Sequence, residues 1–440
     1  MKLLAGASTS NITPALGSSM AGGMTDRIAT DIHDELQVRS LVLDNERTRL
    51  AFALCDLCVL PRAPMARAKH LIHSHTGIPM TNILVAATHT HSAPPAAHLF
   101  QSRPDPAYVE WLIPRIADSV RRAAKRLQPA RIGWGTGRAE GLVFHRRFRM
   151  KPGTIPPDPF GNTTDQVLMN PGVGNPNIAQ PAGPVDPEVG LLVLESLDGK
   201  PIAALASYAL HYVGGEGGGH ISADYFGVWA RLMEGVGMLA NGCSGNINNV
   251  DVRGPAVRPA PYARMESVAG DLARDSKRVW RGIRFEPWVE LAASEEDLDL
   301  EVRFPGPDDV ARARKILASA PADGLLKERP HIYARETLIL AESWPQRVKA
   351  PVQALRIGSL GIATFPGEAF VEMGLEVKAN SPFRPTFLME LANDYHGYIP
   401  TVEGHQQGGY ETWRAKSSYL EKQAAPKMVA SALRQLGRLA

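Results

Sequence analysis

The sequence predicts an α/β protein built from mixed β-sheets that are flanked by helices. Apolar runs of strand length alternate with stretches of helical period along most of the 440-residue chain. Two such runs, 189–194 and 201–210, are separated by a short polar turn and predict an antiparallel pair. The order of strand, helix and strand over 49–60, 64–76 and 83–87 predicts a parallel crossover unit.

The other strand predictions rest on short aliphatic runs bounded by turn residues. In chain order they are 36–43, 131–145, 237–240, 287–304, 352–357, 360–365 and 385–391. The other helix predictions rest on apolar residues that recur every three to four positions. They are 108–127, 225–234, 260–280, 308–318, 332–343, 369–378 and 417–436. Pro114 should kink the first of these helices or break its first turns, because proline removes a backbone hydrogen bond.

One long segment, 151–187, is crowded with Pro, Gly and Asn and shows no period. A loop of this length inside a compact protein is usually functional, so we expect it to lie over a site. We expect one large domain over residues 1–440, with 285–345 as a subdomain or an inserted hairpin with helices.

Composition argues against several functions. The net charge is +3 and no dense run of Lys and Arg occurs, so a nucleic-acid or membrane-surface role gains no support. The three cysteines make no disulfide framework, and Cys55 and Cys58 are interpreted as small apolar residues of a buried strand. The apolar stretch at the amino terminus is too short for a signal peptide. No apolar run in the sequence is long enough to span a membrane. We therefore expect a soluble, cytoplasmic protein.

The most informative stretch is 83–92, where five aliphatic residues lead into His89 and His91. In an extended chain alternate side chains share a face, so both histidines would point the same way. Two imidazoles just past the end of a buried strand can bind a metal or a substrate. Taken alone, such a pair is also typical of surface or hydrogen-bonded histidines.

Three further strand-like runs also lead to metal-competent side chains, namely His211, Glu368 and Tyr398. Ligands gather at the carboxyl ends of strands in α/β sheets, so we expect these residues and His89 to converge. Two imidazoles, a carboxylate and an oxygen donor suit a catalytic zinc ion that keeps a position open for water. Singly, Glu368 also fits a charge at a helix N-terminus, and Tyr398 fits a hydrogen-bonded core ring. Residues 241–249, rich in Gly and Asn, predict exposed amides that hold an anionic or carbonyl oxygen.

Together these motifs resemble those of the neutral/alkaline ceramidase family. Its members are zinc amidohydrolases that cleave N-acylsphingosines. The resemblance runs from Ala5 to the region of Tyr410 and is best over 87–92, 209–211, 365–368 and 393–398. It implies a neutral-ceramidase-like catalytic domain with a metal site at the carboxyl ends of strands. It also implies Zn²⁺ as the cofactor, with ligands His89, His211, Glu368 and Tyr398.

The resemblance assigns roles to residues around the metal as well. His91 would face the carbonyl or the leaving group of the substrate. Arg146, which follows His145 where the family often has Asn, would hold a polar substrate group. Tyr410 would donate its hydroxyl to the developing oxyanion.

Three departures from the family argue against ceramide as the substrate. Residues 245–248 align with the family's segment of glycine, acid, aliphatic residue and serine, so Asn248 stands at the catalytic serine position. Ser244 is close in sequence but out of phase by four residues. A secretion signal is missing, and the chain stops without the extra β-sandwich domain of the ceramidases.

We therefore expect a zinc-dependent hydrolase that cleaves an amide (N-acyl) bond, or less readily an ester, of a small-molecule substrate. Zinc-bound water would attack the carbonyl, Tyr410 and zinc would stabilise the oxyanion, and His91 would help to move protons. One alternative uses the same two histidines and carboxylate as a facial triad for iron(II) in an oxygenase. Another is a non-catalytic carbohydrate- or metabolite-binding protein. The sequence does not fix the oligomeric state, although homo-oligomers are common.

Overall fold

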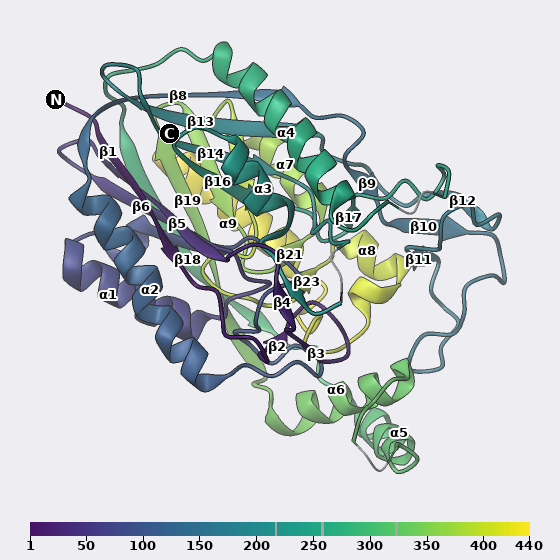
Figure 1. Ribbon diagram of the computed structural model, residues 1–440. Coiled ribbons are helices and arrows are strands. Elements are labelled where there is room, and N and C mark those ends of the chain that lie inside the picture. Colours follow the sequence, from purple (N-terminus) through teal and green to yellow (C-terminus); the bar gives the residue numbers. More distant parts are fainter. Residues whose placement is uncertain (216–217, 257–258, 322–323) are drawn as a thin grey trace.

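A mixed eight-stranded sheet runs through the middle of the computed structural model, which describes residues 1–215, 218–256, 259–321 and 324–440. Within those residues the strand order is β16-β14-β13-β8-β1-β5-β6-β7 (Figure 1). The strands are β1 (Leu4–Asn11), β5 (Gln37–Asp44), β6 (Arg49–Cys55), β7 (Ile83–Ala87), β8 (Gln128–Arg138), β13 (Glu188–Ser196), β14 (Pro201–Tyr208) and β16 (Val236–Asn241). The inner pairs are antiparallel, and the outermost pair at each edge is parallel.

Both parallel pairs are crossover units. Helix α1 (Arg62–Thr76) connects β6 with β7, which pair from Ala51 opposite Ile83. Helix α3 (Asp224–Leu232) lies between β14 and β16, which pair from Ala203 opposite Val236. Parallel neighbours need such a return through a helix, whereas antiparallel neighbours need only a turn. The predicted crossover unit and the predicted antiparallel pair of β13 with β14 are both confirmed.

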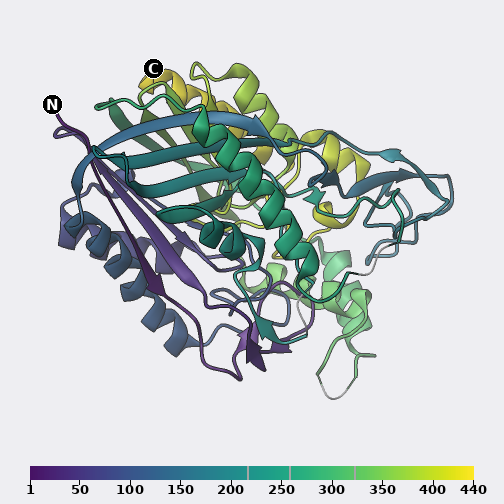
Figure 2. The ribbon, with the colours of Figure 1, turned by 45° about the horizontal axis from the view of Figure 1, so that its top comes forward.

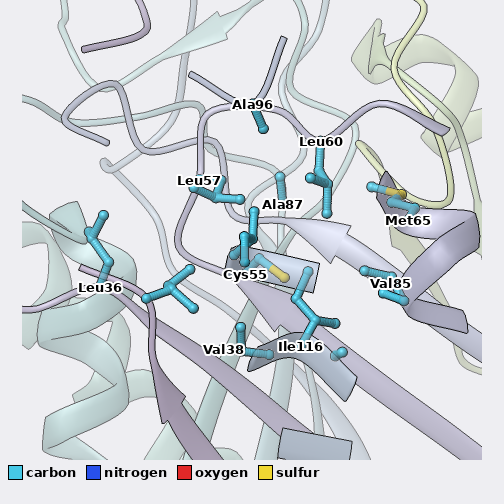
Figure 3. Packing of buried hydrophobic residues seen from close by; sticks show 14 of the residues in the cluster. Leu36, Val38, Cys55, Leu57, Leu60, Met65, Val85, Ala87, Ala96 and Ile116 are labelled. Atoms are coloured by element: carbon cyan, nitrogen blue, oxygen red, sulfur yellow. The ribbon is translucent and has the colours of Figure 1, made fainter. Parts of the chain in front are cut away.

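Alternate side chains of β5, β6 and β7 in the large sheet fill two separate cores. Val38, Cys55 and Val85 point toward α1 and α2 (Pro106–Lys125), where they meet Ile116 (Figure 3). Phe52 points to the opposite face and joins a second core. Both faces are buried, which is why these strands are continuous apolar runs in the sequence.

A second sheet, β18-β19-β20-β22, packs on that opposite face and shares its core. Its strands are β18 (Leu291–Glu301), β19 (Arg347–Ile357), β20 (Leu360–Thr364) and β22 (Thr386–Met389). Helices α7 (Val371–Asn380) and α9 (Ala424–Leu439) pack on its outer side. On the far side of the large sheet, α3 and α4 (Ala263–Arg281) cover β8, β13 and β14 (Figure 2). The described residues thus form helix, sheet, sheet and helix layers.

The segment that follows β22 joins the two edges of the large sheet. The amide of Glu390 donates to the carbonyl of Asn241 at the end of β16, over 2.9 Å. The amide of Ala87 at the end of β7 donates to the carbonyl of Leu391, over 3.1 Å. Strands β16 and β7, at opposite ends of the strand order, are therefore both hydrogen-bonded to the short segment Glu390–Leu391. As a result, the residues that follow β7 and β14 are neighbours in space.

The carboxyl-terminal helix is shorter than the predicted helix 417–436. Helix α9 begins at Ala424, and the residues before it form turns and isolated bridges, with Ser418 bridged to Gly397. Pro426 then lies in the first turn of the helix, where the missing amide of a proline breaks no hydrogen bond.

Three other predictions change in detail. The predicted strand 131–145 is wrong in its second half, since β8 ends at Arg138 and β9 (Phe144–His145) follows a turn. Helix α2 begins at Pro106 and continues through Pro114 unbroken. The segment 151–187 carries two short strands, β11 (Val167–Met169) and β12 (Ile178–Pro181), which pair with β10 (Arg147–Met150).

Helices α5 (Pro307–Leu317) and α6 (Arg329–Ser343) pack against each other beside the sheets (Figure 1). A short helix, α8 (Val402–Gln407), follows the two-residue strand β23 (Tyr398–Ile399). None of the helices that the structure describes combines the length and the hydropathy needed to cross a bilayer.

Candidate metal centre

His89 lies two residues beyond β7, but not on an extended chain as predicted. Its φ of 77° places the backbone in the left-handed region, so the chain turns there. Its amide donates to the carbonyl of Leu57 over 2.9 Å, and its Nδ1 is 2.8 Å from the carbonyl of Cys58. A carbonyl partner requires a proton on Nδ1, so Nε2 is the nitrogen that could bind a metal ion, as in metal-bound histidines.

His211 lies three residues beyond β14 and is oriented in the same way. Its Nδ1 is 3.2 Å from the carbonyl of Ser244, so its Nε2 is also left with a lone pair. The Nε2 atoms of His89 and His211 are 3.1 Å apart. Burial lowers the pKa of His211 well below its ordinary value, which keeps the ring in the neutral form that binds metals.

Glu368 supplies the third group, from the short strand β21 (Glu368–Ala369). Its Oε2 atom is 3.4 Å from Nε2 of His89 and 3.8 Å from Nε2 of His211. This oxygen is buried and has no hydrogen-bond partner among the described residues. Ligand atoms of a tetrahedral zinc ion with bonds of about 2.1 Å lie about 3.4 Å apart. The three atoms therefore fit a zinc ion, which would also satisfy the unpaired oxygen.

A second group of metal-competent side chains, Cys58, His89 and His91, overlaps with the first. Cys58 Sγ is 3.8 Å from Nδ1 of His89, the same nitrogen that donates to the carbonyl of Cys58. A metal ion at that nitrogen would displace this hydrogen bond. The group with His211 and Glu368 has no such conflict.

Tyr398 is positioned beside Glu368 by the backbone. Strand β23 pairs in parallel with β21, and Tyr398 lies opposite Glu368 in that pairing. Burial favours the neutral form of Glu368, but His89, Arg146 and Tyr398 together lower the pKa of this carboxyl. Tyr398 thus lies beside Glu368, and its role as the oxygen donor of the centre stays a prediction.

Tyr395 is a contributor that the sequence did not single out. Its hydroxyl donates to Oε1 of Glu368 over 2.9 Å, which leaves Oε2 facing the two imidazoles. Tyr395 lies within the segment 393–398, which carries part of the family resemblance. This position is the one sequence feature that could have pointed to Tyr395.

Arg146 reaches the same centre from the residue after β9. Its Nε donates to Oε1 of Glu411 over 2.8 Å, and its Nη1 is 3.3 Å from Nε2 of His211. Its buried Nη2 has no hydrogen-bond partner among the described residues. Glu411 is fully buried and also faces Nε of Arg147 at 3.3 Å. No pattern in the sequence singled out Glu411, since its role follows from a contact between distant segments.

His91 and Tyr410 complete the inner surface of the site. Nε2 of His91 is 3.2 Å from Nε2 of His89, and its ring stacks on Tyr212 with centroids 3.6 Å apart. Gly22 lies against His91, and a Cβ atom there would be 2.4 Å from the imidazole. The ring of Tyr410 packs edge-on against Tyr398.

The two remaining sequence candidates have different surroundings. Asn248 faces a cavity and donates from Nδ2 to Oδ1 of Asn170 over 2.6 Å. Asn170 belongs to the predicted covering segment, which therefore does reach the site. Ser244 is fully buried, lines neither cavity of the site, and donates to Oε1 of Glu390 over 2.6 Å.

Two cavities meet at the centre. The inner cavity has a volume of about 100 Å³ and is lined by His89, Glu368 and Tyr395 on its metal-site side. The outer cavity has a volume of about 420 Å³ and is lined by Arg146, His211 and Asn248. Both are also lined by Gly22, Met24, His91, Tyr398 and Tyr410. The residues of the centre are therefore divided between two adjoining cavities.

Fold and site together define an α/β protein with a buried centre of two histidines and one carboxylate. The structure is similar to that of neutral ceramidase from Pseudomonas aeruginosa, with a TM-score of 0.75 and 18% sequence identity, covering 100% of this chain and 74% of that one. A structure described as ceramidase complexed with C2 gives the same TM-score and identity and is covered over 75% of its length. No protein-family model and no curated protein matches the chain. The chain has a neutral-ceramidase-like fold, which confirms the predicted fold class and the family resemblance of the fold.

Proposed function

We propose that the protein is a zinc-dependent hydrolase that cleaves an amide (N-acyl) bond by attack of water. The observation that carries the proposal is the unpaired Oε2 of Glu368 within 3.4 and 3.8 Å of two imidazole nitrogens. His89, His211 and Glu368 would hold the zinc ion, with the hydroxyl of Tyr398 as a fourth ligand. When bound, zinc lowers the pKa of a water molecule and polarises a carbonyl. The ceramidase-like fold favours an amide as the bond that is cleaved.

His91 is suited to move the proton. Burial lowers its pKa well below the ordinary value, so the ring is neutral and can accept a proton from water. Its Nε2 is 3.2 Å from Nε2 of His89, so it lies at the edge of the metal site. The protonated ring can then deliver the proton to the leaving amine.

Tyr410 and Arg146 are suited to hold charge on the substrate. Burial raises the pKa of Tyr410, so its hydroxyl stays protonated and can donate to an oxyanion. Arg146 presents a buried Nη2 without a partner among the described residues, and this donor can bind a polar group of the substrate.

A water nucleophile is favoured over an acyl-enzyme. Asn248 has no nucleophilic oxygen, and the hydroxyl of Ser244 is committed to Glu390 away from both cavities. Neither residue is therefore suited to replace the aligned serine of the ceramidases, and ceramide is not the substrate that we propose.

The test is a panel of N-acyl amino acids, N-acyl sugars, ceramides and simple esters, assayed with zinc-loaded protein. We expect release of an amine from at least one N-acyl compound other than ceramide, loss of activity with EDTA, and recovery with zinc. The variants His89→Ala and Glu368→Ala should lose both zinc and activity, whereas His73→Ala, a change on α1, should keep both. Activity that persists with EDTA, or that needs iron(II) and a reductant, would contradict the proposal.

A further inference from the structure

The inner cavity sets a limit on what can occupy one side of the reacting bond. Its volume of about 100 Å³ is smaller than an apolar cavity of about 150 Å³ that holds one benzene molecule. Beyond the metal site its walls include Met24, Leu99 and Phe100. Glu336 and Lys416 also line it and face each other at 3.7 Å, so their charges do not require a charged ligand. The space fits a short apolar group of about four carbons.

Phe100 and Lys416 form the far wall of this cavity. Both residues also line a separate groove of about 330 Å³, which contains Ile339 and Trp344 but no residue of the metal centre. They therefore stand between the inner cavity and the groove. The chain around Phe100 is held by a turn, in which the amide of Ser102 donates to the carbonyl of Leu99 over 3.0 Å.

The position of Phe100 also depends on an unusual backbone. Its φ is 46°, a left-handed conformation that is unfavourable for a residue with a side chain. The ring packs edge-on against Tyr333 of α6, with centroids 6.1 Å apart. These contacts hold the ring against the end of the cavity.

The outer cavity is about four times larger, and its lining includes Arg146, Asn170, Asn248 and Asn249 together with several valines. These donors and acceptors can bind a polar leaving group, whereas Met24, Leu99 and Phe100 of the smaller inner cavity can contact a short alkyl chain.

We infer that the inner cavity binds the acyl group of the substrate and that Phe100 limits this group to a short chain. The inference rests on the proposed amide hydrolysis and narrows its substrate class to short-chain N-acyl compounds with a polar amine. Phe100 is a specificity-determining residue in this scheme and takes no part in the chemistry.

The first test measures binding without turnover. Zinc-loaded protein is titrated by calorimetry with straight-chain hydroxamic acids of two, four, eight and twelve carbons. Affinity should rise to four carbons and fall by about tenfold or more at eight, because a group larger than its cavity forces strain. Phe100→Gly should restore the affinity for eight carbons, since the cavity then joins the groove. Glycine also adopts positive φ without cost, so this variant should fold.

Ile339→Ala is the matched control, because it enlarges the groove without touching the inner cavity. It should leave the chain-length profile unchanged. Equal affinity for four and twelve carbons in the unmodified protein would overturn the inference, and so would an unchanged profile in Phe100→Gly or no binding of any hydroxamate.

A second test uses hydrolysis and fixes the orientation. N-butanoyl compounds with a large polar amine should be cleaved, and N-dodecanoyl compounds with a small amine should not. The reverse preference would overturn the inference while leaving the hydrolase proposal intact. If hydroxamate affinity depends on chain length as expected but no N-acyl compound is hydrolysed, the hydrolase proposal is refuted. The limit that Phe100 sets on chain length would then still stand.

Discussion

The hydroxyl of Tyr395 donates a hydrogen bond to Oε1 of Glu368 over 2.9 Å, while Oε2 of the same carboxylate faces two imidazole nitrogens. One oxygen is thereby fixed by the protein, and the other is left for a metal ion. Metal-binding carboxylates commonly have one oxygen held by a neighbouring hydrogen-bond donor in this way. We therefore expect Tyr395, a partly buried tyrosine, to influence the affinity of the centre for a metal ion.

Replacing Tyr395 by Phe should weaken zinc binding by about 10- to 100-fold, the usual cost of losing a group that orients a ligand. The measurement is competition for zinc with a chromophoric chelator. Tyr108→Phe is the control, because it removes a buried hydroxyl whose partner is the carbonyl of Ile12 and not a residue of the centre. Equal zinc affinity of all three proteins would contradict the role that we give to Tyr395.

The buried ion pair of Arg146 with Glu411 should be important for stability. Glu411→Gln removes the carboxylate that pairs with the buried guanidinium groups of Arg146 and Arg147. This loss should lower the free energy of unfolding by about 3–5 kcal/mol. Glu110→Gln breaks an exposed pair with Arg67 and should leave the free energy of unfolding nearly unchanged. Urea denaturation of both variants measures the difference, and similar losses in the two would refute it.

Glu390 should make stability depend on pH. Burial raises the pKa of its carboxyl from 4.5 to about 8. Between these values the folded protein holds a proton at Glu390 that the unfolded chain has released. The free energy of unfolding should therefore fall as the pH rises through this window, by about 1.4 kcal/mol per pH unit from this group.

Glu390→Gln imitates the neutral carboxyl at every pH, so the contribution of this group to the slope should disappear. The variant should gain stability relative to the unmodified protein as the pH rises toward 8. Denaturation curves at several pH values measure this difference, and parallel dependences in the two proteins would show that Glu390 is ionised in the fold.

Ser244→Ala should keep most of the hydrolytic activity, because the nucleophile that we propose is water. In an enzyme with a serine nucleophile the same change costs about a millionfold in kcat. Steady-state kinetics on the best N-acyl substrate distinguishes the two cases. A loss on the scale of a missing nucleophile, in a variant that still binds zinc, would mean that Ser244 acts directly.

Much of the architecture could be predicted from local pattern. Strand β7 is fully apolar because both of its faces are buried, and the crossover through α1 follows from the spacing of the apolar runs. The start of the last helix was predicted wrongly because Ser418 is bridged to Gly397, a contact that leaves no periodic signal in the sequence. The candidate metal ligands could be predicted from local pattern as well, because each histidine or carboxylate follows an aliphatic run that predicts a strand.

The sequence by itself determined the chemistry of the centre, because residue type decides which atoms can bind a metal ion, and it determined the layered α/β class through its apolar pattern. Only the tertiary structure decided which atom of each side chain is free. The carbonyls of Cys58 and Ser244 select Nε2 of the two histidines, and Tyr395 selects Oε2 of Glu368. These partners come from separate segments of the chain. Their hydrogen bonds form only when burial in the folded protein removes the water that would otherwise satisfy each group.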